Sequence, residues 1–380
     1  LKNKKLLFVI TEYWYFISHR NELAKFLSRK GYKVYLLTNL NIKKKNLNQN
    51  VFSNNNLEVI DWNINRDSKN IFKEVISIFK NFKTYKLVEP NYVYSVGIKP
   101  ILYCALLSRF FNNINFIYAF AGLGSLFIYQ NFTKKLLQNI IFGLLKIFMK
   151  NKKSKIIFQN IDDKNYFNRK INKSIEQVII KGSGVNTRYF NITKNITKSN
   201  FANVTLLSRF LYDKGVLDFI SIAENIKKIN KNINFYLVGK EDFKNPSALK
   251  INDLLKYERN KIIKIINDPK KVLDIYKFTD IICFPSFREG LPKSLIESSS
   301  CSIPAVVYDV PGCKEVVINN VTGYVVKFRD VQEMQNKIID LIKNKKKRIT
   351  YGKSARDYVI KNYDENIIFN KIYSEIENMY

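Results

Sequence analysis

Two groups of charged residues occupy positions where they could bind a negatively charged ligand. The first group lies in FPSFREGLPKSLIESSSC (284–301), where Glu289 precedes an expected helix and Glu297 lies on it. Pro292 favours the first turn of that helix, and free N–H groups at a helix N-terminus bind anions. Ser294 adds a hydroxyl group there. Two carboxylates beside an anion site suit a ligand with a central phosphate and hydroxyl-bearing rings at both ends; alternatively, Glu297 is an ordinary surface charge of the helix.

The second group lies in LLSRFLYDKG (206–215). Arg209 is expected at the end of a buried strand, and Lys214 follows in the loop before the next helix. Two cations fixed at the carboxyl end of a strand neutralise a diphosphate better than two random surface charges. The alternative is a solvated loop without a ligand.

The elements that position these groups alternate between strands and helices, which is typical of parallel sheets. A first series is expected to have strands at 4–11, 32–39, 57–62, 91–97 and 115–122, and helices at 19–31, 70–83 and 100–111. A second series is expected to have strands at 203–209, 233–239, 280–286 and 303–309, and helices at 216–229 and 292–300.

The fold class predicted from this order is α/β, with two doubly wound Rossmann-like domains facing a central cleft. Ligands of such sheets lie beyond the carboxyl ends of the strands. We expect an N-terminal domain at 1–188 and a C-terminal domain at 189–362, with a last helix at about 363–380 that packs back on the first domain. KGSGVNTRYFN (181–191) is the expected hinge.

Composition excludes several other classes of protein. The chain has 380 residues, of which 46% are hydrophobic and 25% charged, so general disorder is excluded. No apolar stretch has the roughly 18–20 residues of a spanning helix. The first residues are interpreted as a strand rather than a signal peptide. Four widely spaced cysteines predict neither a disulfide framework nor a zinc cluster, and favour a reduced cytosolic protein.

The net charge of +32 indicates an anionic partner. Residues 1–190 hold 32 basic and 10 acidic residues, whereas residues 191–380 hold 32 and 22, so the first half carries most of the excess. The 64 basic residues comprise 52 Lys and only 12 Arg, although proteins that read nucleic acid rely on bidentate Arg. A basic nucleic-acid-binding protein therefore stays a distant alternative, and a solvated Lys-rich surface explains part of the charge.

The segment TKKLLQNIIFGLLKIFMKNKKSK (133–155) combines an apolar helical stripe with many lysines. The stripe consists of residues 136, 137, 140, 141, 144, 145 and 148, and the lysines around it are Lys134, Lys135, Lys146, Lys150, Lys152, Lys153 and Lys155. This pattern predicts an interfacial helix that binds an anionic membrane surface. The alternative is a core helix with lysines at its ends.

The two charged groups together resemble the family-4 retaining glycosyltransferases of the GT-B fold. The pattern S-R-x(4)-K-G is followed some 75 residues later by P-S-x-x-E-G-x-P-x-S-x-x-E. The resemblance spans nearly the whole chain and includes SHR (18–20), GIKPILY (97–103), AGLGSLF (121–127), GSGVNTRYF (182–190), YDVPGCKEVV (308–317) and VTGYVV (321–326). GIKP with AGLGSLF resembles bacterial enzymes that add hexosamine-type sugars to polyprenyl-diphosphate-linked carriers.

This resemblance implies a nucleotide-sugar donor, with UDP as the expected nucleotide, and a lipid-linked saccharide acceptor at the inner face of the cytoplasmic membrane. Arg209 and Lys214 would hold the diphosphate, helped by the helix that begins around Lys293 and Ser294. Glu289 with the Gly290–Leu291 backbone before Pro292 would face the donor sugar, and Glu297 would bind the ribose. No metal or other cofactor is expected, and the configuration at the transferred carbon would be retained. Another donor or a non-lipid acceptor is the alternative.

The sequence departs from the family pattern where many members carry a His that meets the sugar. The matching position is Ala121, beside Gly122, so the Gly122–Gly124 backbone or another group would line that side. The single histidine, His19, follows the first strand and is a candidate for the acceptor side; the alternative is a helix-cap or packing role. A nucleotide-sugar epimerase would need further catalytic residues of its own, so one histidine disfavours it.

Overall fold

The structure, a computed structural model, describes residues 4–40, 57–62, 64, 68, 70–124, 132–149, 153–171, 175–192, 202–243 and 245–379. It divides into two compact units. Unit 1 comprises Leu1–Ser183 and Ile368–Tyr380, and unit 2 comprises Gly184–Ile367. The first boundary lies between Ser183 and Gly184, where the sequence predicts one between residues 188 and 189.

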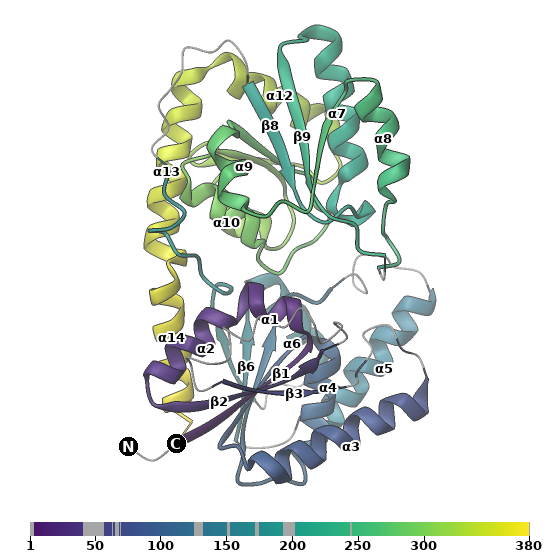
Figure 1. Cartoon of the computed structure of the whole chain (residues 1–380), viewed down its shortest axis with the longest axis vertical. Helices are drawn as coiled ribbons and strands as arrows, with labels where there is room; N and C mark the ends of the chain where they lie inside the picture. The colour runs from purple at the N-terminus through teal and green to yellow at the C-terminus, as the bar shows by residue number, and fades with distance from the viewer. Residues whose placement is uncertain are drawn as a thin grey trace. The chain divides into compact units, whose positions relative to one another are not determined.

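Unit 1 is built on a seven-stranded sheet in the order β3-β2-β1-β4-β5-β6-β7, in which all paired neighbours are parallel (Figure 1). Its strands are β1 Lys4–Glu12, β2 Tyr32–Asn39, β3 Leu57–Asp61, β4 Tyr92–Val96, β5 Asn115–Phe120, β6 Ser154–Phe158 and β7 Glu176–Ile179. Its helices are α1 Tyr13–His19, α2 Asn21–Arg29, α3 Ile71–Val88, α4 Ile98–Leu107, α5 Phe132–Phe148 and α6 Ile161–Lys170.

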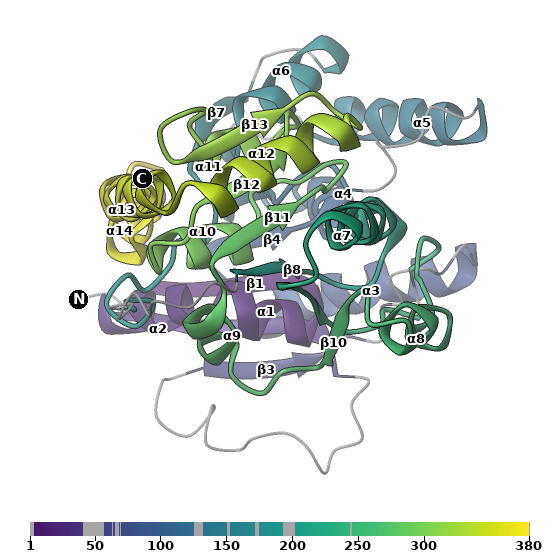
Figure 2. The same cartoon turned by 90° about the horizontal axis from the view of Figure 1, so that it is seen from above.

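The central strands of unit 1 read as continuous apolar runs because both faces of the sheet are covered. In β1, all five residues from Leu6 to Ile10 are buried, and they alternate between two core clusters. Leu7 and Val9 belong to the cluster that includes residues of α4 and α5, and Leu6 and Phe8 belong to the other. Such runs are the signature of a parallel sheet with helices on both faces. Figure 2 shows α3 and α5 projecting from the same side of unit 1, and α4 contacts both of them.

The last helix, α14 (Glu365–Glu377), completes the second core cluster of unit 1. Ile368, Phe369, Ile372 and Ile376 are buried there, beside residues of β1, β2 and α2. Charged contacts fix the same helix: Lys4 pairs with Glu377 at 3.0 Å, and the buried Lys155 of β6 pairs with Glu375 at 2.6 Å.

Unit 2 contains a six-stranded sheet in the order β10-β9-β8-β11-β12-β13, also with parallel neighbours. Its strands are β8 Ala202–Leu207, β9 Ile233–Gly239, β10 Lys264–Asn267, β11 Ile281–Phe284, β12 Ala305–Tyr308 and β13 Gly323–Val326. Its helices are the short 3-10 helix Tyr212–Lys214, then α7 Val216–Ile229, α8 Ile251–Arg259, α9 Val272–Phe278, α10 Lys293–Ser300, α11 Cys313–Val316, α12 Val331–Lys343 and α13 Lys345–Tyr363.

The structure corrects two local predictions. The helix expected at 19–31 is present but shorter, as α2 (Asn21–Arg29), and a further short helix that was not predicted, α1 (Tyr13–His19), precedes it. The helix expected through 133–155 ends at Phe148, and Lys155 is a buried residue of β6 rather than part of a lysine border. Its charge is tolerated there because two carboxylates, Glu176 and Glu375, compensate it.

The apolar stripe predicted for this segment divides between two environments. Leu145 lies in the core and Ile141 and Phe148 pack against it, whereas Leu136, Leu137 and Ile140 are exposed. The predicted Lys150 and Lys152 lie outside the described residues. Of the helices in the described ranges, none combines the length and apolar character needed to span a membrane.

We predict that Glu375→Ala lowers the free energy of unfolding by about 2–4 kcal/mol, because the Lys155 ammonium, 2% exposed, loses its nearer carboxylate. Glu22→Ala, which removes an exposed pair with Lys25, should change it by less than about 0.5 kcal/mol. Urea unfolding followed by circular dichroism measures both. Lys155→Met should cost less than Glu375→Ala, since it also removes the buried charge. Equal effects of the two Glu substitutions would contradict the assigned role of Glu375.

Candidate functional site

The charged residues singled out in the sequence of unit 2 follow two adjacent strands. Arg209 and Lys214 come after β8, and Glu289 comes after β11, which pairs directly with β8. The direction in which successive strands are added to the sheet reverses between β8 and β11. Strands β9 and β10 follow on one side of β8, whereas β12 and β13 follow on the far side of β11. In a doubly wound sheet this switch point is where ligands bind, beyond the carboxyl ends of the strands.

Lys214 and Glu289 are in direct contact although 75 positions separate them. The Lys214 Nζ lies 2.5 Å from Glu289 Oε1, and the Ser286 hydroxyl donates to the same oxygen at 2.8 Å. Both charged side chains are mostly buried. The carboxylate and the ammonium are therefore held at fixed positions at the edge of the sheet. The sequence predicts both residues, but it gives no signal for the role of Ser286 in orienting Glu289.

Two glycines allow the loops that carry this pair to approach other backbone segments. Gly215 has φ +69°, and a Cβ atom there would lie 1.9 Å from the carbonyl oxygen of Pro285. Gly312 has φ +80°, and a Cβ atom there would lie 2.7 Å from the carbonyl oxygen of Gly290. Both positions therefore require glycine. The loop after β12, within YDVPGCKEVV, thus supports the loop that carries Glu289.

Arg209 has a carboxylate partner that the sequence analysis did not identify. Its Nη1 donates to Asp242 Oδ2 at 2.5 Å. Asp242 follows β9, which pairs with β8, so both residues lie at the carboxyl edge of the sheet. Neither side chain is fully buried. Arg209 and Lys214 thus each have a carboxylate partner of their own.

Helix α10 begins directly after the Glu289 loop. Pro292 is its N-cap rather than its first helical residue, and the half-buried Gly290 and Leu291 precede it. Ser294 donates its hydroxyl to the carbonyl oxygen of Leu207 at 3.2 Å, which ties the first turn of α10 to the end of β8. The hydroxyl oxygen can still accept a hydrogen bond, but its proton is engaged within the protein.

Glu297 is a buried residue of α10, not the surface charge that the sequence left as an alternative. The Tyr276 hydroxyl donates to its Oε2 at 3.2 Å, and Lys293 lies 3.7 Å from its Oε1. Burial is the largest influence and raises the pKa of Glu297 above its ordinary value, while Lys293 and Tyr276 act in the opposite direction. Tyr276 comes from α9, and no sequence spacing indicates this contact.

The unit 1 candidates lie at the carboxyl edge of the other sheet, after β1 and β5. His19 is half-buried; its ring stacks on Tyr15 with centroids 4.3 Å apart, and its Nδ1 lies 2.6 Å from the Ser18 hydroxyl. Gly122 and Gly124 follow β5 with φ of +98° and +76°, and the residues after Gly124 in AGLGSLF lie outside the described ranges.

Arg20, next to His19, is a further candidate that the sequence analysis did not single out. Its side chain is buried, its Nη1 donates to the carbonyl oxygen of His19 at 2.9 Å, and its Nε has no hydrogen-bond partner. Its position in the SHR motif was the available signal. Within the described residues, no group of three or more His, Cys, Asp and Glu is arranged to hold a metal ion.

Comparison with known proteins assigns this arrangement to a family. Residues 5–160 match the family model described as glycosyl transferase 4-like, and residues 190–358 match the model described as glycosyl transferases group 1. Together the two matches cover most of the chain, and each falls on one of the two sheets. The chain is a two-domain glycosyltransferase.

Two relatives and one solved structure illustrate the similarity. The glycosyltransferase is 27% identical over 337 residues to the N,N'-diacetylbacillosaminyl-diphospho-undecaprenol alpha-1,3-N-acetylgalactosaminyltransferase of Campylobacter jejuni, covering 84% of this chain and 86% of the relative. It is 22% identical over 259 residues to the UDP-Gal:alpha-D-GlcNAc-diphosphoundecaprenol alpha-1,3-galactosyltransferase of Escherichia coli, covering 65% of each. HepE from Anabaena in complex with UDP matches with a TM-score of 0.77 at 16% identity, over 98% of this chain and 100% of that one. The predicted GT-B fold and the prediction of a glycosyltransferase are confirmed, while retention of configuration stays a prediction.

We predict that Arg209→Ala and Lys214→Ala each raise the activation free energy of turnover by about 2–4 kcal/mol, because each would remove a cation that is expected to face charge developing on a leaving phosphate. Lys277→Ala, which removes an exposed ion pair with Asp274, is the matched control and should leave turnover unchanged. Steady-state kinetics measures all three, with circular dichroism to verify folding. Near-normal rates in both site variants would exclude the predicted contact with the diphosphate.

Proposed function

We propose that the glycosyltransferase transfers a sugar from a nucleotide sugar to a saccharide carried on polyprenyl diphosphate, in the synthesis of a surface glycan. The proposed donor is a UDP-N-acetylhexosamine. The contact between Lys214 and Glu289 at the switch point of the second sheet supports the donor site most directly. The acceptor class rests on the Campylobacter relative, whose name specifies a diphospho-undecaprenol acceptor and which aligns with 84% of this chain.

In the proposed donor site, Arg209 and Lys214 bind the diphosphate, and the N-terminus of α10 adds its backbone N–H groups. The carboxylates of Asp242 and Glu289 hold the two cations in place before the donor binds. Glu297 accepts hydrogen bonds from the ribose hydroxyls. Glu289 and the backbone of Gly290 and Leu291 face the transferred sugar. These cations stabilise charge on the leaving phosphate, so the proposed reaction needs no metal ion.

The proposed transfer retains configuration at the anomeric carbon. The bond from that carbon to the donor phosphate oxygen breaks, and the acceptor oxygen forms its bond on the same face of the sugar. The acceptor hydroxyl gives its proton to the departing phosphate oxygen, so no separate catalytic base is required. His19 and the backbone of Gly122 and Gly124 are the proposed unit 1 contributions to the acceptor side; both lie at the carboxyl edge of that sheet.

A lipid-linked acceptor requires the enzyme to work at a membrane surface, and we propose the inner face of the cytoplasmic membrane. The excess of lysine in the first half of the chain supports an anionic bilayer as a partner. Nucleic acid is not a proposed partner, because the basic residues are mostly Lys and the described aromatic side chains of both sheets are largely buried.

The proposal is tested by incubating the purified protein with a panel of UDP- and GDP-sugars and polyprenyl-diphosphate-linked saccharides. We expect transfer from a UDP-N-acetylhexosamine to a lipid-linked saccharide, with the same anomeric configuration in product and donor. The reaction should continue in EDTA. Transfer only to water-soluble acceptors, or a complete loss in EDTA that magnesium reverses, would contradict the acceptor or the metal-independent mechanism respectively.

We predict that Glu289→Gln lowers kcat more than Glu297→Gln does, whereas Glu297→Gln mainly raises KM for the donor. A group that faces the transferred sugar affects the transition state, while a ribose contact is made equally in the ground and transition states. Initial rates over a range of donor concentrations separate the two parameters. A KM effect at Glu289 with a kcat effect at Glu297 would show that the two roles are exchanged.

A further inference from the structure

Helix α3 is apolar on two sides. Its buried side combines the core residues Tyr85 and Val88 with the polar Ser77, Asn81 and Thr84. Its exposed face carries Ile71, Phe72, Val75, Ile76 and Phe79, each between 55% and 81% exposed. A helix on the surface of a protein in water normally carries polar residues on its exposed face. The exposed apolar face of α3 is therefore not explained by the packing of unit 1.

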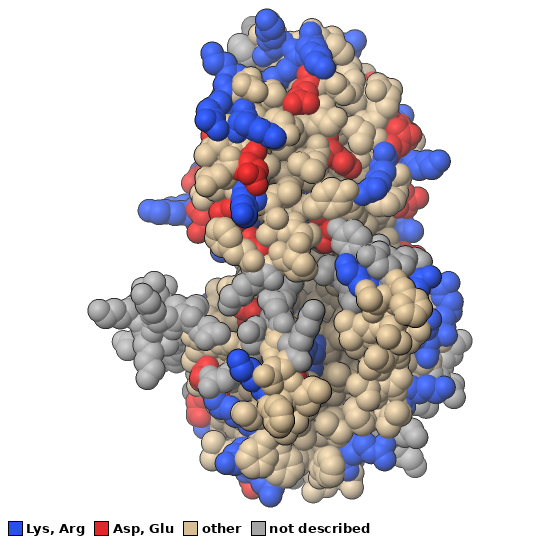
Figure 3. All heavy atoms as spheres, turned by 90° about the vertical axis from the view of Figure 1, so that its right-hand side faces the viewer, with Lys and Arg blue, Asp and Glu red and all other residues tan. Residues whose placement is uncertain are grey.

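Helix α5 presents a second exposed apolar face on the same side of unit 1. Phe132, Leu136, Leu137, Ile140 and Ile147 are each between 47% and 82% exposed. Figure 3 shows this side of unit 1, in the lower half of the view, as a broad uncharged area with Lys and Arg along its border. In unit 2 the exposed large apolar side chains of the described residues lie singly or in pairs on different elements, which is usual for a surface.

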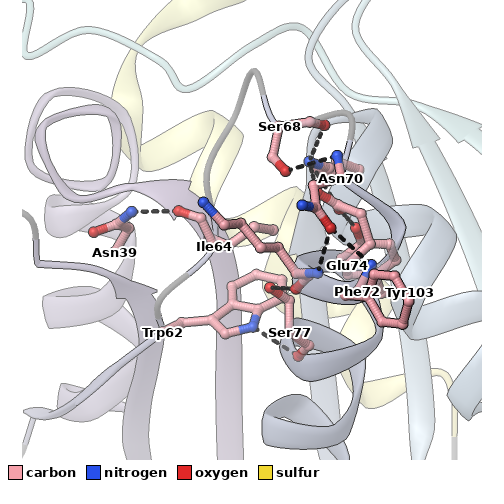
Figure 4. A network of polar contacts seen from close by, with 11 residues as sticks. Asn39, Trp62, Ile64, Ser68, Asn70, Phe72, Glu74, Ser77 and Tyr103 are labelled. Carbon is pink, nitrogen blue, oxygen red and sulfur yellow. Dashed lines mark hydrogen bonds and ion pairs between the residues drawn. The ribbon is translucent and has the colours of Figure 1, made fainter.

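Specific contacts hold α3 in this orientation (Figure 4). Asn70 caps the helix by accepting from the N–H groups of Phe72 and Lys73. Glu74 pairs with Lys99 of α4 at 2.8 Å and accepts from the Tyr103 hydroxyl.

The indole N–H of Trp62 donates to the carbonyl oxygen of Ser77 at 2.9 Å. The contacts with Trp62, Lys99 and Tyr103 lie on the inner side of α3 and fix its rotation, so its apolar face points toward solvent.

The charges on both helices are almost entirely positive. Helix α3 contains four lysines and one acidic residue, Glu74, which Lys99 already neutralises; α5 contains three lysines and no acidic residue. Lys83 lies over the Phe79 ring at 4.7 Å, and Lys86 over Phe82 at 4.9 Å. An apolar face with lysines next to its aromatic rings fits the boundary between lipid headgroups and acyl chains. A second copy of this chain, paired about a two-fold axis, would bring the lysines of both copies together.

We propose that the exposed faces of α3 and α5, the α3–α5 surface, bind an anionic bilayer. The apolar side chains of α3 enter the headgroup region, and Lys83 and Lys86 bind lipid phosphates. The choice of a membrane as partner rests on the proposed function, in which the acceptor is lipid-linked. The location of the surface rests on α3 and α5 themselves, and α3 was not indicated by the sequence pattern.

The test measures binding of the full chain to phosphatidylglycerol vesicles and to phosphatidylcholine vesicles by cosedimentation. Salt is set at about 0.1 M and about 1 M, where the Debye length is about 10 Å and 3 Å. Three double variants are compared: Phe72→Ser with Ile76→Ser on α3, Lys83→Gln with Lys86→Gln on α3, and Ile229→Ser with Val321→Ser in unit 2. The last pair is the control, because its side chains are also exposed but lie outside the α3–α5 surface.

We expect the Phe72/Ile76 variant to bind phosphatidylglycerol vesicles at least about tenfold more weakly, with the loss persisting at high salt, since it removes apolar contact. The Lys83/Lys86 variant should lose about 30-fold at low salt and little at high salt, at about fivefold for each lysine. The control should bind like the unmodified chain. Circular dichroism should be the same for all, because the replaced side chains are exposed.

Two results would overturn the proposal. One is vesicle binding by the Phe72/Ile76 variant that equals that of the unmodified chain at high salt. The other is an unmodified chain that does not bind vesicles but forms a dimer, together with a Phe72/Ile76 variant that is monomeric. That result would assign the surface to contact with a second copy.

Transfer to a short-chain, water-soluble acceptor separates this proposal from the proposed function. Loss of vesicle binding with normal transfer to that acceptor supports the surface and leaves the enzyme activity intact. Vesicle binding through α3 without transfer to any acceptor would reject the function and keep the surface.

Discussion

Every strand pairing within the two sheets is parallel, and this constraint decides where polar side chains can gather. Helices cover both faces of a parallel sheet, so the middle of each strand has little room for charge. The loops at the carboxyl edge are free of this restriction, and there residues distant in sequence meet. Lys214 and Glu289 can form a close ion pair because β8 and β11 end side by side. The sharp turns that this requires explain why Gly215 and Gly312 have no room for a Cβ atom.

The sequence predicts the features that depend on local pattern. Continuous apolar runs such as Leu6–Ile10 identify the strands, and charged residues in the loops that follow them, Arg209 and Glu289, identify the edge of the sheet. It does not predict the partners Asp242 and Tyr276, because those contacts depend on how side chains point across elements that are far apart in the chain. The corrections have the same origin: the lysines of 133–155 look alike in sequence, but the strand register of β6 puts Lys155 in the interior.

Helix α3 shows why an apolar residue count is a poor guide to burial. Its apolar residues at 71, 72, 75, 76 and 79 have the spacing of a core-facing stripe, so the sequence pattern alone predicts that this stripe is buried. The structure turns it outward because the opposite face has more specific contacts: Trp62 and Lys99 reach partners on α3 that only this orientation provides. Directional polar contacts thus act together with the buried Tyr85 and Val88 to fix the rotation of the helix, and the remaining apolar residues form the exposed face that we propose binds a bilayer.

The dependence of unit 1 on α14 also has a consequence for how the protein is made. Ile368, Phe369 and Ile372 belong to the same core cluster as residues of β1, so a strand that precedes unit 2 in the chain is covered by a helix that follows almost all of unit 2. Unit 2 lies between them in the chain and has all its own strands beforehand. During synthesis, unit 2 can therefore complete its core while one face of the unit 1 sheet is still uncovered. Over the same period Lys155 lacks its ion pair with Glu375, which has not yet been translated. The sheet of unit 1 is translated first, but its core is completed last. Until α14 is made, the uncovered face of unit 1 needs protection from aggregation.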